Sequence, residues 1–203
     1  METLDHIVLA AETLEEGVTY VQDRLAVDLE EGGEHALFGT HNRLLSLGDC
    51  YFEVIARNPS AERANRSIWF DLERFSGPPR VITWVCQTSD MGLTLQALPY
   101  DPGKIVTVTR DDLIWDLTIR EDGRLAMDGT APLIIDWKNI NSPTKRLPDT
   151  GCRLKKLTVF HPRTAQLSEW VEHSLQDLRI VFKTAEVSKI TLTLTTPNGD
   201  VDL

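Results

Sequence analysis

The sequence predicts an α+β fold built from a repeated unit of one strand, one helix and three further strands. Short segments rich in β-branched and aromatic residues alternate with turn signals, and amphipathic segments with cap signals follow the first strand of each repeat. The repeat rests on element order and cap position, because identity between the copies is low. It divides the chain into a first unit (1–58), a helical connector (59–79), a second unit (80–140) and a third, shorter unit (152–203).

The first unit has the clearest signals. Its opening strand is expected at 4–10, and Thr13 and Glu16 have the spacing of a capping box for a helix that runs to about residue 25. Gly32-Gly33 is expected to interrupt the chain. The remaining strands are predicted at 35–38, 42–47 and 50–55.

The connector and the second unit follow. Ser60 is expected to cap a connector helix that ends at Gly77-Pro78-Pro79. The second unit should contain a helix opening at Ser89-Asp90 and strands at 81–87, 104–109, 113–120 and 132–138. When the helix caps of the two units are superposed, the counterparts of His6, Val8 and Glu53 are Thr83, Val85 and Asp136.

The third unit predicts a strand at 153–160, a helix, and strands at 179–183, 189–195 and 200–203. Its helix and its strand at 189–195 each carry an apolar face. We expect these faces to close one end of the sheet or to form a homodimer contact. A chain that serves mainly as an assembly module is a weaker hypothesis.

Composition limits the function. The formal net charge of −10 and the pI near 4.9 argue against nucleic acid as a partner. No apolar run has membrane-spanning length, so no membrane contact is expected. The three cysteines, odd in number and without paired spacing, predict free thiols and a cytoplasmic protein. The partner that remains is a small-molecule substrate or ligand.

Two polar residues lie in the middle of predicted apolar strands. Alternation places His6 on one face with Leu4 and Val8, and it places Glu53 with Tyr51 and Ile55. Burying such groups is costly unless they pair, ligate a metal or line a pocket. The alternatives are a core histidine that is hydrogen-bonded to a neighbouring strand, and a Glu53 carboxylate that is paired with Arg43 or Arg57.

These features resemble the vicinal oxygen chelate superfamily, and within it the glyoxalase-like subgroup. The resemblance is carried by five segments: Leu4-Asp5-His6-Ile7-Val8, Gly32-Gly33-x-His35, Phe38-Gly39-Thr40-x-Asn42-x-Leu44, Tyr51-Phe52-Glu53-Val54-Ile55 and Pro132-Leu133-Ile134-Ile135-Asp136-Trp137. It implies that paired units curl into a U-shaped mixed sheet with helices outside. On the concave face a divalent metal would chelate two adjacent substrate oxygens.

The resemblance also implies a ligand set. His6, Glu53 and Asp136 would hold the ion, which is Zn, Mn, Fe, Ni or Mg if it is present. The fourth family position is Thr83, a poor ligand for a divalent cation, and we assign it to substrate binding together with His35 and Asn42. For His35 and Asn42 the alternative is turn chemistry. Trp137, next to Asp136, is expected on the opposite face, under the helices.

Two functions follow from this reading. The first is a metal-dependent lyase, isomerase or dioxygenase that acts on a small substrate with vicinal oxygens, with Glu53 as the catalytic base. The alternative is a metal-free protein that sequesters a small molecule in the same cleft, which the loss of a ligand at Thr83 favours.

Overall fold

The computed structural model describes residues 2–62, 66–138 and 142–203. These residues form an eight-stranded sheet in the order β2-β3-β4-β1-β5-β8-β7-β6 and a four-stranded sheet in the order β10-β9-β11-β12. The first half of the large sheet comes from the first predicted unit, with its elements in the predicted order. These elements are β1 (Thr3–Ala10), α1 (Leu14–Leu25), β2 (Glu30–His35), β3 (Thr40–Ser46) and β4 (Tyr51–Arg57).

The other half comes from the second predicted unit. The two halves meet where β1 pairs antiparallel with β5, and there His6 lies opposite Val85 and Val8 lies opposite Thr83. Each residue thus lies opposite the counterpart of the other. A two-fold relation between the units requires this pairing if His6 corresponds to Thr83 and Val8 to Val85. The elements of this half are β5 (Arg80–Gln87), α2 (Met91–Ala97), β6 (Lys104–Arg110), β7 (Leu113–Ile119) and β8 (Leu133–Asp136).

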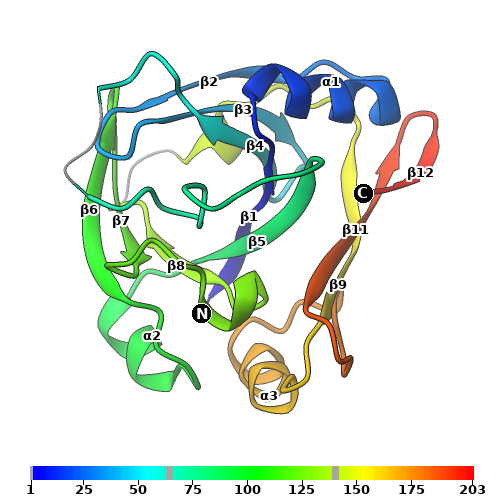
Figure 1. Ribbon diagram of the computed structural model, residues 1–203. Coiled ribbons are helices and arrows are strands. Elements are labelled where there is room, and N and C mark those ends of the chain that lie inside the picture. The colour runs from blue at the N-terminus through cyan, green and yellow to red at the C-terminus, as the bar shows by residue number, and fades with distance from the viewer. Residues whose placement is uncertain (1, 63–65, 139–141) are drawn as a thin grey trace.

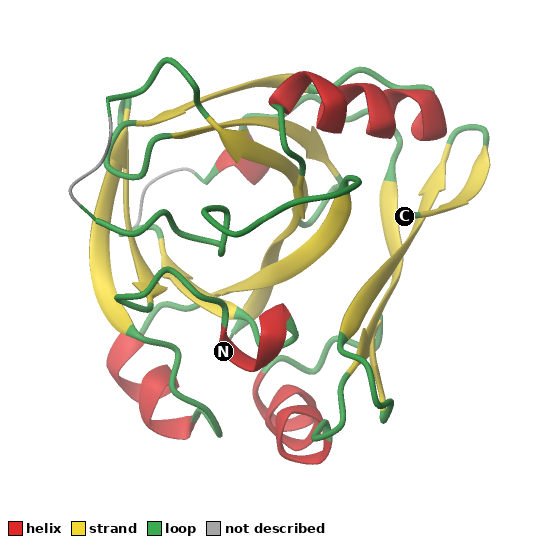
Figure 2. Ribbon diagram, in the orientation of Figure 1, coloured by secondary structure: helices red, strands yellow, loops and turns green. Residues whose placement is uncertain are grey.

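The large sheet curls until its edge strands, β2 and β6, approach each other (Figure 1). The helices α1, α2 and α3 lie outside the curl (Figure 2). Helix α1 begins as predicted, because the Thr13 hydroxyl accepts a hydrogen bond from the backbone N–H of Glu16 at 3.2 Å. The α+β fold and the curled mixed sheet of the prediction are therefore confirmed.

The third unit covers the outer face of the large sheet. Its elements form a four-stranded sheet that stands beside the curl, with β11 against β5 (Figure 1). Leu157, Trp170 and Leu192 of this unit share an apolar cluster with Ile7 and Trp84 of the large sheet. The faces that suggested a homodimer are thus used within the chain, and the homodimer stays a prediction. The elements of this unit are β9 (Arg153–Phe160), α3 (Ala165–Ser174), β10 (Ile180–Lys183), β11 (Lys189–Thr196) and β12 (Gly199–Asp202).

The predicted connector helix is wrong for the described part of 59–79, which contains turns and no helix. Phe70 and Asp71 each have a φ of 56°, in the left-handed region that ends a regular helix. The apolar residues Trp69, Phe70 and Leu72 instead pack inside the curl. Tertiary burial overrides the helical spacing of these residues.

Two further sequence features have clear outcomes. Cys50, Cys86 and Cys152 are free, as predicted, and all three are buried. Within the described ranges, no helix is both long and apolar enough to cross a membrane.

Candidate functional site

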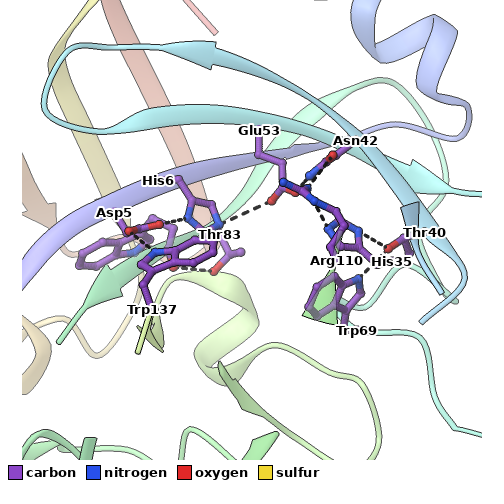
Figure 3. Close-up of polar contacts among 11 residues, drawn as sticks. Asp5, His6, His35, Thr40, Asn42, Glu53, Trp69, Thr83, Arg110 and Trp137 are labelled. Atoms are coloured by element: carbon purple, nitrogen blue, oxygen red, sulfur yellow. Dashed lines mark hydrogen bonds and ion pairs between the residues drawn. The ribbon is translucent and has the colours of Figure 1, made fainter. Parts of the chain in front are cut away.

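The interior of the curl contains a small pocket of about 20 Å³, room for roughly one water molecule. Most of the sequence-predicted site residues line it, and each comes from a different strand. His6 lies on β1, Asn42 on β3, Glu53 on β4, and Arg110 at the end of β6 (Figure 3). His35, the last residue of β2, completes the polar lining.

A bulge in β1 decides which residues reach this pocket. The pairing of β1 with β5 shifts register between Leu4 and His6, so Asp5 is an extra residue in the strand. Leu4 therefore packs in the outer cluster, and His6 faces the interior together with Val8. The expected face sharing of His6 with Leu4 is wrong, because simple alternation takes no account of a bulge.

The bulge also brings Asp5 beside its neighbour His6. Asp5 Oδ1 lies 2.6 Å from His6 Nδ1, and Asp5 Oδ2 accepts a hydrogen bond from Trp137 Nε1 at 2.8 Å (Figure 3). Both Asp5 and His6 are buried. A carboxylate on Nδ1 places the ring proton there and directs Nε2 toward the pocket.

Glu53 lies on the other side of the His6 ring. Glu53 Oε2 is 3.5 Å from His6 Nε2, and Glu53 Oε1 accepts a hydrogen bond from the Asn42 amide at 2.5 Å. Its contacts are therefore His6 and Asn42, and among the described residues neither Arg43 nor Arg57 forms an ion pair with it. One imidazole thus stands between two buried carboxylates.

The Asn42 amide is itself held in place by β2. The backbone N–H of Gly33 donates to Asn42 Oδ1 at 2.8 Å. A Cβ at Gly32 would lie 2.0 Å from Asn42 Oδ1, and one at Gly33 would lie 2.6 Å from Arg110 Cδ. The two glycines therefore do not interrupt the chain as predicted; they lie within β2 and let its backbone approach these side chains.

His35 forms a second polar group in the pocket. Its Nδ1 lies 3.0 Å from the Thr40 hydroxyl, which also accepts a hydrogen bond from Trp69 Nε1. Its Nε2 lies 3.4 Å from a nitrogen of Arg110, which can only donate, so Nε2 accepts and Nδ1 carries the proton. Burial, and then the charge of Arg110, lower the pKa of His35 to about 3.

Tyr51 borders the acid–base groups. Its ring stacks on His6, with the ring centroids 4.5 Å apart. Burial, followed by the charges of Asp5 and Glu53, raises the pKa of the Tyr51 hydroxyl well above its usual value. Tyr51 therefore stays a neutral phenol beside the two carboxylates.

The three remaining site predictions have different outcomes. Thr83 is fully buried beside the site, but its hydroxyl points to the backbone carbonyl of Trp84 and it does not line the pocket (Figure 3). Asp136 lies outside the pocket, where it contacts the Lys138 ammonium at 3.5 Å. Trp137 lines the pocket, contrary to its expected position under the helices.

Pairing register explains the position of Asp136. Val8 pairs with Glu53 in the first unit, and its counterpart Val85 pairs with Leu133 in the second. The structural counterpart of Glu53 is thus Leu133, which packs in the inner cluster. Asp136 comes three residues later, on the opposite face of β8 from the pocket-lining Ile135.

The residues present fit only half of the metal site that the resemblance implies. His6 Nε2 and Glu53 Oε2, 3.5 Å apart, are close enough to share one ion, since bonds of about 2 Å keep two ligands within about 4 Å. The second unit offers Thr83 and Leu133 instead of two further ligands. In the described part of the chain, no group of three or more His, Cys, Asp or Glu residues is arranged to hold a metal. The donor set therefore does not fit a resident ion.

Sequence reasoning missed Asp5, Tyr51 and Arg110. Tyr51 could have been found, because it shares a strand face with Glu53. Asp5 and Arg110 could not, since one depends on a bulge and the other on the closure of the sheet.

A second, larger cavity of about 760 Å³ is lined by none of the predicted site residues. Phe38 lines this cavity and Trp69 lines the small pocket. Their rings stack in parallel, with the centroids 4.2 Å apart. The stacked pair therefore lies between the two spaces.

Comparison with known proteins agrees with this fold. A family model described as glyoxalase-like domain matches residues 4–175. No curated protein sequence matches the chain. The crystal structure of a hypothetical protein from Staphylococcus aureus is similar in fold, with a TM-score of 0.66, 16% identity, and coverage of 93% of this chain and 88% of that chain.

Two epimerase structures show weaker similarity. Methylmalonyl-CoA epimerase from Mycobacterium tuberculosis has a TM-score of 0.42 and 19% identity, and the match covers 66% of this chain and 85% of that chain. The Streptomyces coelicolor epimerase in complex with 2-nitronate-propionyl-CoA has a TM-score of 0.44 and 11% identity, with coverage of 66% and 96%. The family model spans most of the sequence, and the chain therefore belongs to the glyoxalase-like domain family.

Proposed function

We propose that the chain is an enzyme that moves a proton on a small substrate with adjacent oxygens. The observation that supports this most directly is the buried array of Asp5, His6 and Glu53, with one imidazole between two carboxylates. Burying two carboxylates is costly. Packed cores avoid such an arrangement, whereas catalytic sites tolerate it. A substrate has to displace the groups that now fill the pocket, since its free volume is about 20 Å³.

In this proposal Glu53 is the base. Its Oε1 is fixed by Asn42, so Oε2 is presented to the pocket. Glu53 takes a proton from a carbon next to a carbonyl group, and the electron pair of that C–H bond moves onto the carbonyl oxygen. Return of the proton to the opposite face of that carbon, or to the neighbouring carbon, completes an isomerisation, and departure of a neighbouring group with the electron pair completes a lyase reaction.

His6 stabilises the oxygen on which charge develops. When Nε2 carries a proton, it donates a hydrogen bond to that oxygen, while Asp5 holds Nδ1 at 2.6 Å. Trp137 fixes the second oxygen of Asp5, so the imidazole is oriented before the substrate arrives. An iron-dependent oxygenase needs three protein ligands, so the proposal is limited to lyase and isomerase chemistry.

The metal-free binding protein is the second candidate. Thr83 and Leu133 at the ligand positions of the second unit favour it. The divalent ion expected between His6 and Glu53 is not part of this proposal, because the described part of the second unit supplies no further ligands. The cytoplasmic location and the homodimer stay predictions. Light scattering across a dilution series tests the homodimer.

Hydrogen exchange in D₂O tests the enzymatic proposal without knowledge of the product. A panel of neutral 2-hydroxyketones and 2-oxoaldehydes, together with 2-hydroxy and 2-oxo acids, is followed by proton NMR for loss of the C–H signal. We expect the wild-type chain to accelerate exchange of at least one compound. We expect Glu53→Gln to slow that exchange by about 10²- to 10⁴-fold, the usual contribution of a general base.

The control variant is Glu172→Gln, at an exposed position of α3, which should exchange like the wild type. Thermal melts show whether Glu53→Gln still folds. Exchange at the wild-type rate in a folded Glu53→Gln variant would refute the role of Glu53. Binding of panel members without any exchange would favour the sequestering protein.

A further inference from the structure

Arg110 is the one charged group of the pocket that the proposed acid–base chemistry does not use. It ends β6, at the far edge of the large sheet from β2, and the curl of the sheet brings it into the site (Figure 3). A terminal nitrogen of its guanidinium group lies 3.3 Å from Asn42 Oδ1 and 3.4 Å from His35 Nε2. Through Asn42 it is one residue away from Glu53.

This guanidinium has no ion-pair partner among the described residues. No described carboxylate forms an ion pair with Arg110, and the undescribed positions 1, 63–65 and 139–141 contain neither Asp nor Glu. Its Nε is buried and has no hydrogen-bond partner in the described part of the chain. A buried N–H of a charged group is costly to leave unpaired, so the site lacks an acceptor.

The side chains that contact Arg110 carry no negative charge, so they leave its positive charge available to an anion. Asn42 is an uncharged amide. His35 is a neutral acceptor, because burial and the nearby charge of Arg110 lower its pKa to about 3. Gly33 supplies the space for the Arg110 side chain, since a Cβ there would lie 2.6 Å from Arg110 Cδ.

We propose that Arg110 binds the carboxylate of the substrate, so that the substrate class is the small 2-hydroxy or 2-oxo carboxylic acids. A guanidinium group presents parallel N–H donors that match a carboxylate. In such an acid a carboxylate oxygen and the oxygen on the adjacent carbon are vicinal. The proton for Glu53 comes from the carbon next to the ketone carbonyl in a 2-oxo acid, and from the carbon next to the carboxylate in a 2-hydroxy acid. Binding of the carboxylate is inferred from the unpaired guanidinium alone. The position of the C–H bond beside Glu53 rests on the proposed function.

A monocarboxylate fits better than a phosphate dianion. Glu53 lines the pocket and Asp5 lies against the Nδ1 side of the His6 ring, so a further negative charge in the pocket is repelled by two buried carboxylates. A planar carboxylate is also smaller than a tetrahedral phosphate, so it has to displace less of what now fills the pocket.

Calorimetric titration of the full chain tests the assignment. The probes are lactate and pyruvate, lactamide as the neutral analogue of lactate, and inorganic phosphate. We expect the two acids to bind at least about ten-fold more tightly than lactamide or phosphate, because one hydrogen-bonded charge is lost or mismatched in each analogue. Arg110→Met should weaken binding of the acids by about ten-fold or more.

Arg110→Lys keeps the charge but loses the paired donors, so it should bind the acids with intermediate affinity. Arg120→Met, at a half-buried arginine outside the pocket that pairs with Asp101, is the matched control and should bind like the wild type. Glu53→Gln removes a neighbouring negative charge, so it should bind the acids at least as tightly as the wild type. If Arg110→Met does not fold, the affinity of Arg110→Lys for the acids is compared with that of the wild type instead.

Three results would overturn the assignment: unchanged acid binding in a folded Arg110→Met or Arg110→Lys variant, tighter binding of phosphate than of lactate, or no acid binding by the wild type. Failure of the proposed function looks different. In that case the acids bind in an Arg110-dependent manner, but Glu53→Gln exchanges C–H protons like the wild type.

Discussion

At the scale of single residues, the site depends on ionisable groups whose charge is set by their immediate contacts. His35 is the clearest case. It is buried, its two ring nitrogens contact Thr40 and Arg110, and both burial and the guanidinium favour its neutral form. A neutral His35 leaves Arg110 unpaired, which is the condition for binding an anion.

The low pKa of His35 predicts a dependence of stability on pH. Between its usual pKa of 6.5 and the folded value of about 3, the unfolded chain binds a proton at His35 that the folded chain does not bind. The free energy of unfolding should therefore decrease as the pH falls below 6.5, by up to ~1.4 kcal/mol per pH unit from this residue. Urea unfolding at several pH values measures this slope.

His35→Gln removes the titrating group and should flatten this part of the slope. His173→Gln, at an exposed position of α3, is the control and should retain the wild-type slope. Equal slopes in wild type and His35→Gln would show that His35 is not held neutral.

At the scale of elements, the edge strand β2 contacts both its neighbour β3 and the opposite edge strand β6. Its Gly33 donates a backbone hydrogen bond to Asn42 and borders the Arg110 side chain of β6. The strand therefore orients both the residue that holds Glu53 and the residue that faces the substrate carboxylate. A side chain at this position would disturb both.

Gly33→Ala tests this role. The new Cβ would lie 2.6 Å from Arg110 Cδ, so the Arg110 side chain has to move. We expect a loss of ~1–3 kcal/mol in the free energy of unfolding, as for other overpacked sites, together with weaker binding of lactate. Chemical unfolding and calorimetry measure the two effects.

Gly92→Ala in α2 is the matched control. Its Cβ would meet Asp90 Oδ1 at 3.5 Å, an ordinary contact, and alanine favours a helix over glycine by ~0.5–1 kcal/mol. We expect this control to be at least as stable as the wild type and to bind lactate normally. Wild-type stability and lactate binding in Gly33→Ala would contradict the role given to β2.

At the scale of the whole molecule, the two units have become unequal. Strand pairing places Thr83 and Leu133 of the second unit where the first unit has His6 and Glu53. The third unit covers the outer face of the sheet and leaves the interior to the other two. The acid–base groups therefore come from the first unit, and the second unit contributes Arg110 and aromatic walls.

The sequence was sufficient for the fold because strand composition, the Thr13 cap and the order of elements are local signals. It was sufficient for half of the site, since His6 and Glu53 are polar residues inside apolar strands. Asp5 depends on a bulge, and Arg110 depends on the contact between distant sheet edges, neither of which has a local signal. Asp136 was misplaced because superposing the helix caps takes no account of the different spacing between β5 and β8.

In the proposed reaction, proton transfer runs on Asp5, His6 and Glu53 without a resident metal ion. The most direct measurement is the divalent metal content of the chain, purified without added metal and without chelator, together with its C–H exchange rate. We predict well below one ion per chain and an exchange rate that a chelator does not change. The double variant Thr83→His with Leu133→Glu restores two ligand positions and should raise the metal content. About one ion per wild-type chain, lost in His6→Ala and required for exchange, would contradict the claim.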